Sequence, residues 1–67
     1  MKRVCDNISE LYFKKGTTQE VFGDCIGARQ GCVGHWINRQ NDPNSKWIPR
    51  IAEFFGVPID RLFEGVE

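Results

Sequence analysis

The segment Gln19–Asn38, QEVFGDCIGARQGCVGHWIN, decides the fold of this chain. Its apolar residues recur at helical spacing on both sides of Gly27, at Phe22, Ile26, Ala28, Val33 and Trp36. Gly27 can adopt the positive φ needed to leave a helix sharply. Gly23 carries no side chain at the point where the two helices would cross. The spacing therefore predicts two short helices joined by a tight turn, the helix-turn-helix pattern.

Helix signals continue on both sides of this segment. A first helix is predicted from about residue 4 to Lys15, because Val4, Ile8, Leu11 and Tyr12 line one face of it. Two lysines followed by Gly16 suit its C-terminal end. Thr18 is the expected N-cap of the next helix, which runs to about Ile26, with Thr17 as an alternative cap one residue earlier.

The second half of the chain predicts three more helices. One is expected at about Gln30–Ile37, and its Gly31 and Gly34 make it depend on packing for stability. Ser45 can cap a fourth helix that reaches Phe55, although Pro49 favours a regular start only near Ile48–Pro49. Gly56 should end that helix, and the segment 57–63 reads as a short fifth helix with Pro58 at its start. The predicted class is all-α.

Length and hydropathy indicate one soluble domain over residues 1–67. The longest apolar runs fall far short of the roughly 20 residues needed to cross a bilayer. The start of the chain carries no signal-peptide core. We therefore expect an intracellular protein with no membrane partner.

The cysteines exclude several site classes. There are three, an odd number with no C-x-x-C pair, which favours reduced thiols over a disulfide framework. Cys32 and His35 lie one helical turn apart, but zinc normally takes three or four protein ligands. The same pair has no visible third group to orient it for nucleophilic catalysis. We expect no metal, no cofactor, no small-molecule ligand and no enzymatic activity.

Charge is distributed unevenly along a chain whose formal net charge is zero. Residues 1–50 hold eight Lys/Arg against five Asp/Glu, whereas residues 51–67 hold one against four. A neutral chain does not by itself favour binding to phosphates, which reward Lys and Arg. The uneven distribution predicts a basic part of the surface and an acidic end held away from it.

Nearly the whole chain, from Ile8 to Gly65, resembles the DNA-binding domain of the lambda-repressor and Cro family. The resemblance is carried by three groups of residues. They are Ile8 and Leu11; Gly16-Thr17-Thr18-Gln19-Glu20 followed by Gly27, Val33, Trp36 and Asn38; and Pro43, Ile51-Ala52, Gly56-Val57 and Asp60-Arg61-Leu62-Phe63-Glu64-Gly65. It implies a compact five-helix domain in which the helix-turn-helix is formed by helices 2 and 3. Such a domain binds double-stranded operator DNA as a homodimer, with the third helix in the major groove.

The resemblance also implies roles for residues by position. Base contacts are expected from Arg29, Gln30, Gly31, Cys32 and His35. Phosphate contacts are expected from Thr18, Gln19, Asn38, Arg39, Gln40 and Lys46, with Gln19 also supporting the third helix. The family function is that of a phage or prophage repressor or Cro-like transcription regulator. It acts in the cytoplasm of a bacterial host cell, at the nucleoid.

The chain departs from the family pattern at two places. Where many relatives pair an Arg in the first helix with a Glu after the third, this chain has Tyr12 and Ile37. We expect these two side chains to touch, which avoids an unpaired buried charge. Arg29 stands where the family has a Ser or Thr cap, so the third helix is expected to lack a side-chain N-cap.

Several of these residues also have simpler interpretations. The Gln30 amide can pair with the N6/N7 edge of adenine, or it can be a solvated helix residue. His35 can contact guanine or phosphate, or it can be an exposed histidine without a task. Gly31 and Gly34 either let the helix backbone sit deep in the groove or reflect relaxed selection. Trp36 is expected in the core, and Trp47 lies either against the sugar-phosphate backbone or over the core edge.

Apolar residues beyond the needs of a five-helix core suggest a protein partner. They are Phe13, Val21, Cys25, Phe54 and Phe63. We expect a dimer interface at Phe54, Val57, Pro58 and Phe63. The alternative hypothesis is a protein-interaction module of the same fold, such as an antitoxin-like partner. A third possibility is that the chain is the DNA-binding part of a longer repressor.

Overall fold

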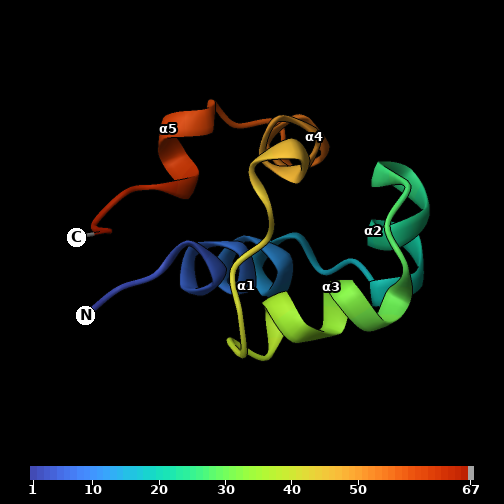
Figure 1. Ribbon diagram of the computed structural model, residues 1–67. Helices are drawn as coiled ribbons and strands as arrows, with labels where there is room; N and C mark the ends of the chain where they lie inside the picture. Colours follow the sequence, from blue (N-terminus) through green and yellow to red (C-terminus); the bar gives the residue numbers. More distant parts are fainter. Residues whose placement is uncertain (67) are drawn as a thin grey trace.

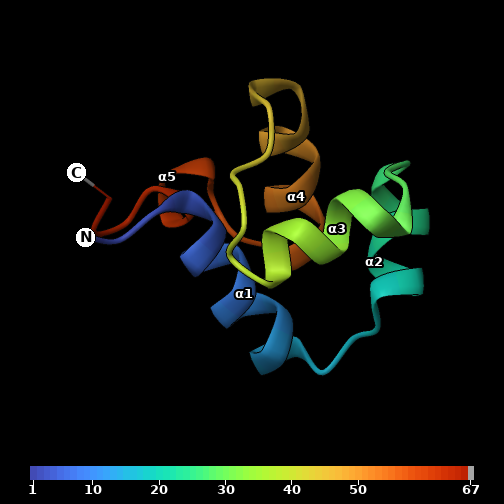
Figure 2. The ribbon, with the colours of Figure 1, turned by 60° about the horizontal axis from the view of Figure 1, so that its bottom comes forward.

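The protein is described by a computed structural model of residues 1–66, which contains five α-helices and one 3₁₀ turn in that range. In chain order these elements are α1 (Val4–Lys15), α2 (Gln19–Ile26), α3 (Gln30–Ile37), η1 (Ser45–Trp47), α4 (Ile48–Phe55) and α5 (Ile59–Leu62). A single bridge between Lys2 and Val66 is the only extended pairing within residues 1–66, and it holds the two ends of the described chain together (Figures 1 and 2). The predicted all-α class is confirmed.

The helices are arranged around α1. It packs against α3, α4 and α5, while α2 packs against α3 and α4. Figure 1 shows α3 along the lower edge of the molecule, with α4 above α1 and with α2 at the end opposite the termini. In Figure 2 the lower edge comes forward and α3 crosses the front. One side of α3 therefore faces the other helices, and its other side faces outward.

The core is centred on Phe22, which is fully buried. Its ring stacks on Phe54, with centroids 4.9 Å apart and planes at 20°, and lies 5.1 Å from the ring of Phe55. Trp36 reaches it from α3 at 6.4 Å. The aromatic rings thus join α2, α3 and α4. Most of the predicted core positions are buried, including Val4, Ile8, Leu11, Tyr12, Ile26, Val33, Ile48, Ile51 and Ala52.

Helix ends follow the predicted signals in most places. Gly16, Gly27 and Gly56 end α1, α2 and α4 with φ of 76°, 78° and 67°. The Thr18 side chain accepts a hydrogen bond from the Val21 N–H at 3.2 Å, as an N-cap should. Arg29 provides no side-chain cap for α3, which confirms that expectation.

Two expectations about the later helices are wrong in detail. Ser45 does not cap α4, because it begins η1. The expected regular start near Ile48–Pro49 is confirmed, since α4 begins at Ile48 with Pro49 in its first turn. Proline is tolerated only in the first turn of a helix, so the regular helix cannot begin earlier. The fifth helix is shorter than predicted and covers Ile59–Leu62, with Pro58 as its N-cap residue.

A buried asparagine holds α1 to the end of α5. Asn7 is fully buried, and its Nδ2 donates to the carbonyl oxygens of Leu62 at 2.7 Å and Glu64 at 3.0 Å. Leu62 is the last residue of α5, and Glu64 lies two residues beyond the end of that helix. The side chain therefore takes the place of water for carbonyls that no helix satisfies.

The crossing of α2 and α3 depends on Gly23. Its carbonyl oxygen accepts the N–H groups of Gly27 and Ala28, the latter at 2.9 Å. A Cβ at this position would lie 2.9 Å from the Ala28 carbonyl oxygen and 3.6 Å from the Val33 side chain. Only glycine fits here without a backbone shift, as expected from the sequence. Tyr12 and Ile37 are both buried in the core, and direct contact between them stays a prediction.

Two helix glycines provide a matched test of this crossing. Gly23→Ala should lower the free energy of unfolding by about 1–3 kcal/mol, because the added methyl collides with backbone. Gly31→Ala should raise it by up to about 1 kcal/mol, because alanine favours the helix and a Cβ there meets nothing within 4 Å. Urea denaturation of both variants measures the difference. Equal stability of the two variants would show that α2 and α3 do not cross tightly.

Candidate nucleic-acid interface

The turn between α2 and α3 is held by α4 as well as by its own backbone. The Arg50 Nη1 donates to the Ile26 carbonyl at 3.1 Å, at the end of α2. The same guanidinium lies over the Trp47 ring, with the carbon Cζ 5.8 Å from the centroid. No local sequence pattern indicates this role of Arg50, because its partner lies 24 positions earlier in the chain. Its position fixes the turn that sets the direction of α3.

The outer face of α3 carries all the residues expected to contact bases. Val33, Trp36 and Ile37 are buried on the inner face of the helix. The remaining side of the helix and its N-cap are exposed, and this outer face comprises Arg29, Gln30, Gly31, Cys32 and His35. The helix thus separates a packed face from a polar, accessible face. Such a face can present an amide, a guanidinium and an imidazole to one partner.

The two glycines of α3 lie in different surroundings. A Cβ at Gly31 would meet nothing within 4 Å, so packing inside the chain does not require glycine there. A Cβ at Gly34 would lie 3.4 Å from the Gln19 Oε1. The half-buried Gln19 side chain at the start of α2 therefore lies against α3. Its two expected roles, support of that helix and contact with a phosphate, stay predictions.

The loop after α3 carries three exposed polar residues, Asn38, Arg39 and Gln40. Arg39 forms an ion pair with Asp6, with Nε 3.3 Å from Oδ1. Beyond the loop, the exposed Lys46 lies with its Nζ 5.0 Å from the centroid of the Trp47 ring. Thr18 is exposed too, with its hydroxyl oxygen engaged in capping α2. Five of the six expected phosphate-contacting residues are therefore exposed, Gln19 being half-buried. The two cations among them, Arg39 and Lys46, already have partners within the chain.

Acidic residues hold the start of α1 next to this loop. Asp42 Oδ1 accepts from the Cys5 N–H at 3.1 Å and lies 3.7 Å from the Arg3 Nε. Asp6 Oδ2 accepts from the Arg3 N–H at 2.8 Å. Two of the five acids in residues 1–50 are thus used at one helix N-terminus, where carboxylates are favourable.

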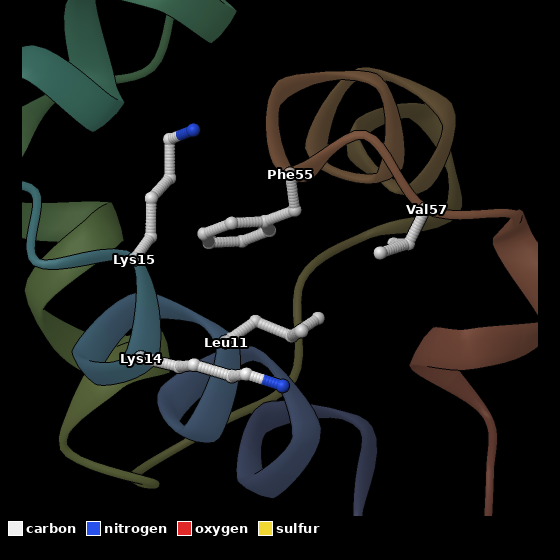
Figure 3. Close-up of a pocket in the computed structure, with 5 residues that line it drawn as sticks. All are labelled: Leu11, Lys14, Lys15, Phe55 and Val57. Atoms are coloured by element: carbon white, nitrogen blue, oxygen red, sulfur yellow. The ribbon is translucent and has the colours of Figure 1, made fainter.

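A separate surface lies between α1 and α4 and is lined by both apolar and cationic side chains. Leu11, Phe55 and Val57 border a groove of about 270 Å³, together with Lys14 and Lys15 (Figure 3). Figure 3 shows Phe55 and Leu11 extending from α4 and α1, with the two lysines on the α1 side. The Lys15 Nζ also lies 5.2 Å from the centroid of the Phe54 ring. An apolar segment with negative charge would suit this groove.

The residues expected at a dimer interface have different exposures. Pro58 and Phe63 are exposed, and Phe63 is 46% accessible. Val57 and Phe54 are half-buried and pack against the core. The expectation that Phe54 is surplus to the core is wrong, because its ring stacks on that of Phe22 and packs against the core. Sequence periodicity cannot show which ring of the Phe54-Phe55 pair is stacked.

Within residues 1–66 no cluster of three or more His, Cys, Asp or Glu side chains is placed to hold a metal ion. In the same range, no helix has the length and apolar character needed to span a bilayer. Comparisons with known protein families, with characterised proteins and with solved structures found no match. The candidate interface therefore rests on the geometry of α2, α3 and the loop that follows.

The cysteines allow a chemical test of these surfaces. Burial, with the Asp42 carboxylate alongside, raises the pKa of the Cys5 thiol to about 11 from an ordinary value of 9.0. Iodoacetamide at neutral pH should therefore modify the exposed Cys25 and Cys32 and leave Cys5 unmodified until the protein unfolds. Peptide mass spectrometry identifies the modified thiols. Rapid modification of Cys5 in the folded protein would contradict the packing of α1. A partner bound to the outer face of α3 should slow the modification of Cys32 but not that of Cys25.

Proposed function

We propose that this chain is a sequence-specific double-stranded DNA-binding transcription regulator of the lambda-repressor and Cro type. In this proposal α2 and α3 form the helix-turn-helix, and α3 enters the major groove of an operator. The observation that carries the proposal is the division of α3 into a packed face and an outer face. The outer face presents Arg29, Gln30 and His35, the side-chain types that read base edges.

Gly31 adds independent support for a close macromolecular partner. Glycine in a helix interior costs up to about 1 kcal/mol relative to alanine. Packing within the chain gives no reason for it, because a Cβ at this position would meet nothing within 4 Å. A partner that approaches the α3 backbone closely explains the residue. The floor of a DNA major groove is such a partner.

Two substitutions separate base contacts from phosphate contacts. Gln30→Ala should weaken binding to the preferred site by about 1–3 kcal/mol and relax the preference at one base pair per half-site. Arg39→Ala should weaken binding to all duplexes alike and reduce the salt slope by about one. The preferred site comes first from selection of bound sequences out of random duplex DNA. Affinities follow from fluorescence anisotropy over a range of salt concentrations.

The opposite pattern would reverse the assigned roles. In that case Arg39→Ala would change the sequence preference and Gln30→Ala would not. If selection yields no preferred sequence and the protein binds no duplex, the regulator proposal fails.

The same proposal includes a homodimer on a palindromic operator. One domain of this size covers only a short DNA site, so a second copy is needed for a longer operator. The apolar side chains of Ile59 and Phe63, near the end of the chain, are 45% and 46% exposed and are available for contact with that copy. Two copies related by a two-fold axis should protect half-sites about 34–36 Å apart, roughly one turn of DNA. Hydroxyl-radical footprinting checks this spacing. A footprint of one half-site at saturating protein would exclude the symmetric dimer.

A protein-interaction module is the second candidate function, and the groove between α1 and α4 is the observation that favours it. Its apolar walls and its two lysines suit a segment of another protein that combines an apolar side chain with carboxylates. Under this hypothesis, Lys14→Glu with Lys15→Glu would abolish binding to the partner. Under the regulator hypothesis, substitutions on the outer face of α3 have the larger effect.

A further inference from the structure

Arg39 adopts a backbone conformation that arginine rarely takes. Its φ is 63°, and it is the one non-glycine residue with positive φ in the described chain. Side chains other than glycine enter this region at a cost, so the surroundings must hold the residue there. Its carbonyl oxygen accepts from the Arg3 Nη1 at 3.4 Å, and its guanidinium pairs with Asp6. Contacts from the start of α1 therefore hold the residue that follows α3.

The two members of the Asp6–Arg39 pair are held unequally. One Asp6 oxygen is fixed by the Arg3 N–H at 2.8 Å, and the Asp6 side chain is 23% exposed. The Arg39 side chain is 56% exposed and meets Asp6 through Nε. A guanidinium has five N–H donors in a planar fork, which suits a phosphate as well as a carboxylate. The carboxylate is thus the fixed partner, and the guanidinium is free to exchange.

We infer that Asp6 is an internal counter-ion that a DNA backbone phosphate displaces from Arg39. The inference rests on the proposed function and deepens it, because it identifies a residue outside α2 and α3 that sets affinity for duplex DNA. In the free protein the Asp6 carboxylate neutralises Arg39. On binding, the guanidinium turns to a phosphodiester, and the loss of the Asp6 contact opposes binding at every sequence. Asp6 therefore lowers general affinity and leaves base selection to the outer face of α3.

The size of the expected change in DNA affinity follows from the exposure of the Asp6–Arg39 pair. Solvent-exposed ion pairs contribute little, and the range measured for them corresponds to a change of roughly 1.4- to 5-fold in an equilibrium constant. Asp6→Asn removes the charge and keeps an oxygen that can accept from the Arg3 N–H. It should therefore tighten binding to a duplex of mixed sequence by roughly 1.4- to 5-fold.

A double-mutant cycle separates this exchange from a general change in charge. The four proteins are the wild type, Asp6→Asn, Arg39→Ala and the double variant, each measured by anisotropy with a fluorescein-labelled duplex of mixed sequence. Asp6→Asn should tighten binding by a larger factor when Arg39 is present than when residue 39 is alanine, because only the general change in charge remains in the alanine background. Alanine keeps the same backbone strain as arginine, so it is the matched background.

Three results would overturn the inference. Equal tightening in both backgrounds would mean that Asp6 acts only through overall charge. Weaker binding of Asp6→Asn, with its circular dichroism and thermal midpoint unchanged, would mean that the pair positions the loop for DNA. An unchanged affinity would mean that phosphate does not compete for Arg39.

A replacement variant and the binding of the wild type keep the experiment decisive. If Asp6→Asn does not fold, Asp6→Ser provides an uncharged acceptor at the same position. If neither the wild type nor any variant binds duplex DNA, the proposed function has failed. That result is distinguishable from failure of the counter-ion inference, in which the wild type binds and the cycle shows no coupling.

Discussion

The close crossing of α2 and α3 at Gly23 is the constraint on which the rest of the structure depends. One carbonyl oxygen, that of Gly23, accepts the N–H groups that end α2 and begin the turn. With no Cβ at residue 23, the Ala28 carbonyl can approach the α2 backbone closely. A turn this short leaves little freedom in the direction of α3. Its apolar face therefore meets the core, and the polar residues between its apolar positions face outward.

Phe22, next to this crossing, packs against α4 and so links the crossing to the second half of the chain. Its ring stacks on Phe54, and Arg50 on the same helix donates to the end of α2. Two residues of α4 thus contact α2 next to the turn, Phe54 through its ring and Arg50 through its hydrogen bond. Loss of the Arg50 hydrogen bond would leave a carbonyl of α2 without that partner, in a partly buried place where an unmade bond is costly.

The cations of this neutral chain are largely engaged with partners inside the protein. Arg39 pairs with Asp6, Lys46 lies over Trp47, and Arg50 holds the turn. Net charge is therefore a poor guide to phosphate binding here, because local partners set how much each cation can gain from a phosphate. In the proposed complex, affinity for the DNA backbone reflects the exchange of these internal contacts for phosphate contacts.

The sequence by itself determined the helices, most of their ends and most of the core, because periodicity, glycine caps and the Thr18 cap act over a few residues. The predicted burial of Val33 and Trp36 also indicated which side of α3 faces the core. The base-contacting roles of the five residues came from the family resemblance alone and stay predictions. The tertiary structure alone decided the Asp6–Arg39 pair, the Asp42 contact with α1 and the Asn7 contacts with the end of α5. Those contacts join residues 33 to 57 positions apart. Local sequence patterns cannot predict contacts between residues so far apart in the chain, because only the packing of α1 against its neighbours brings the partners together.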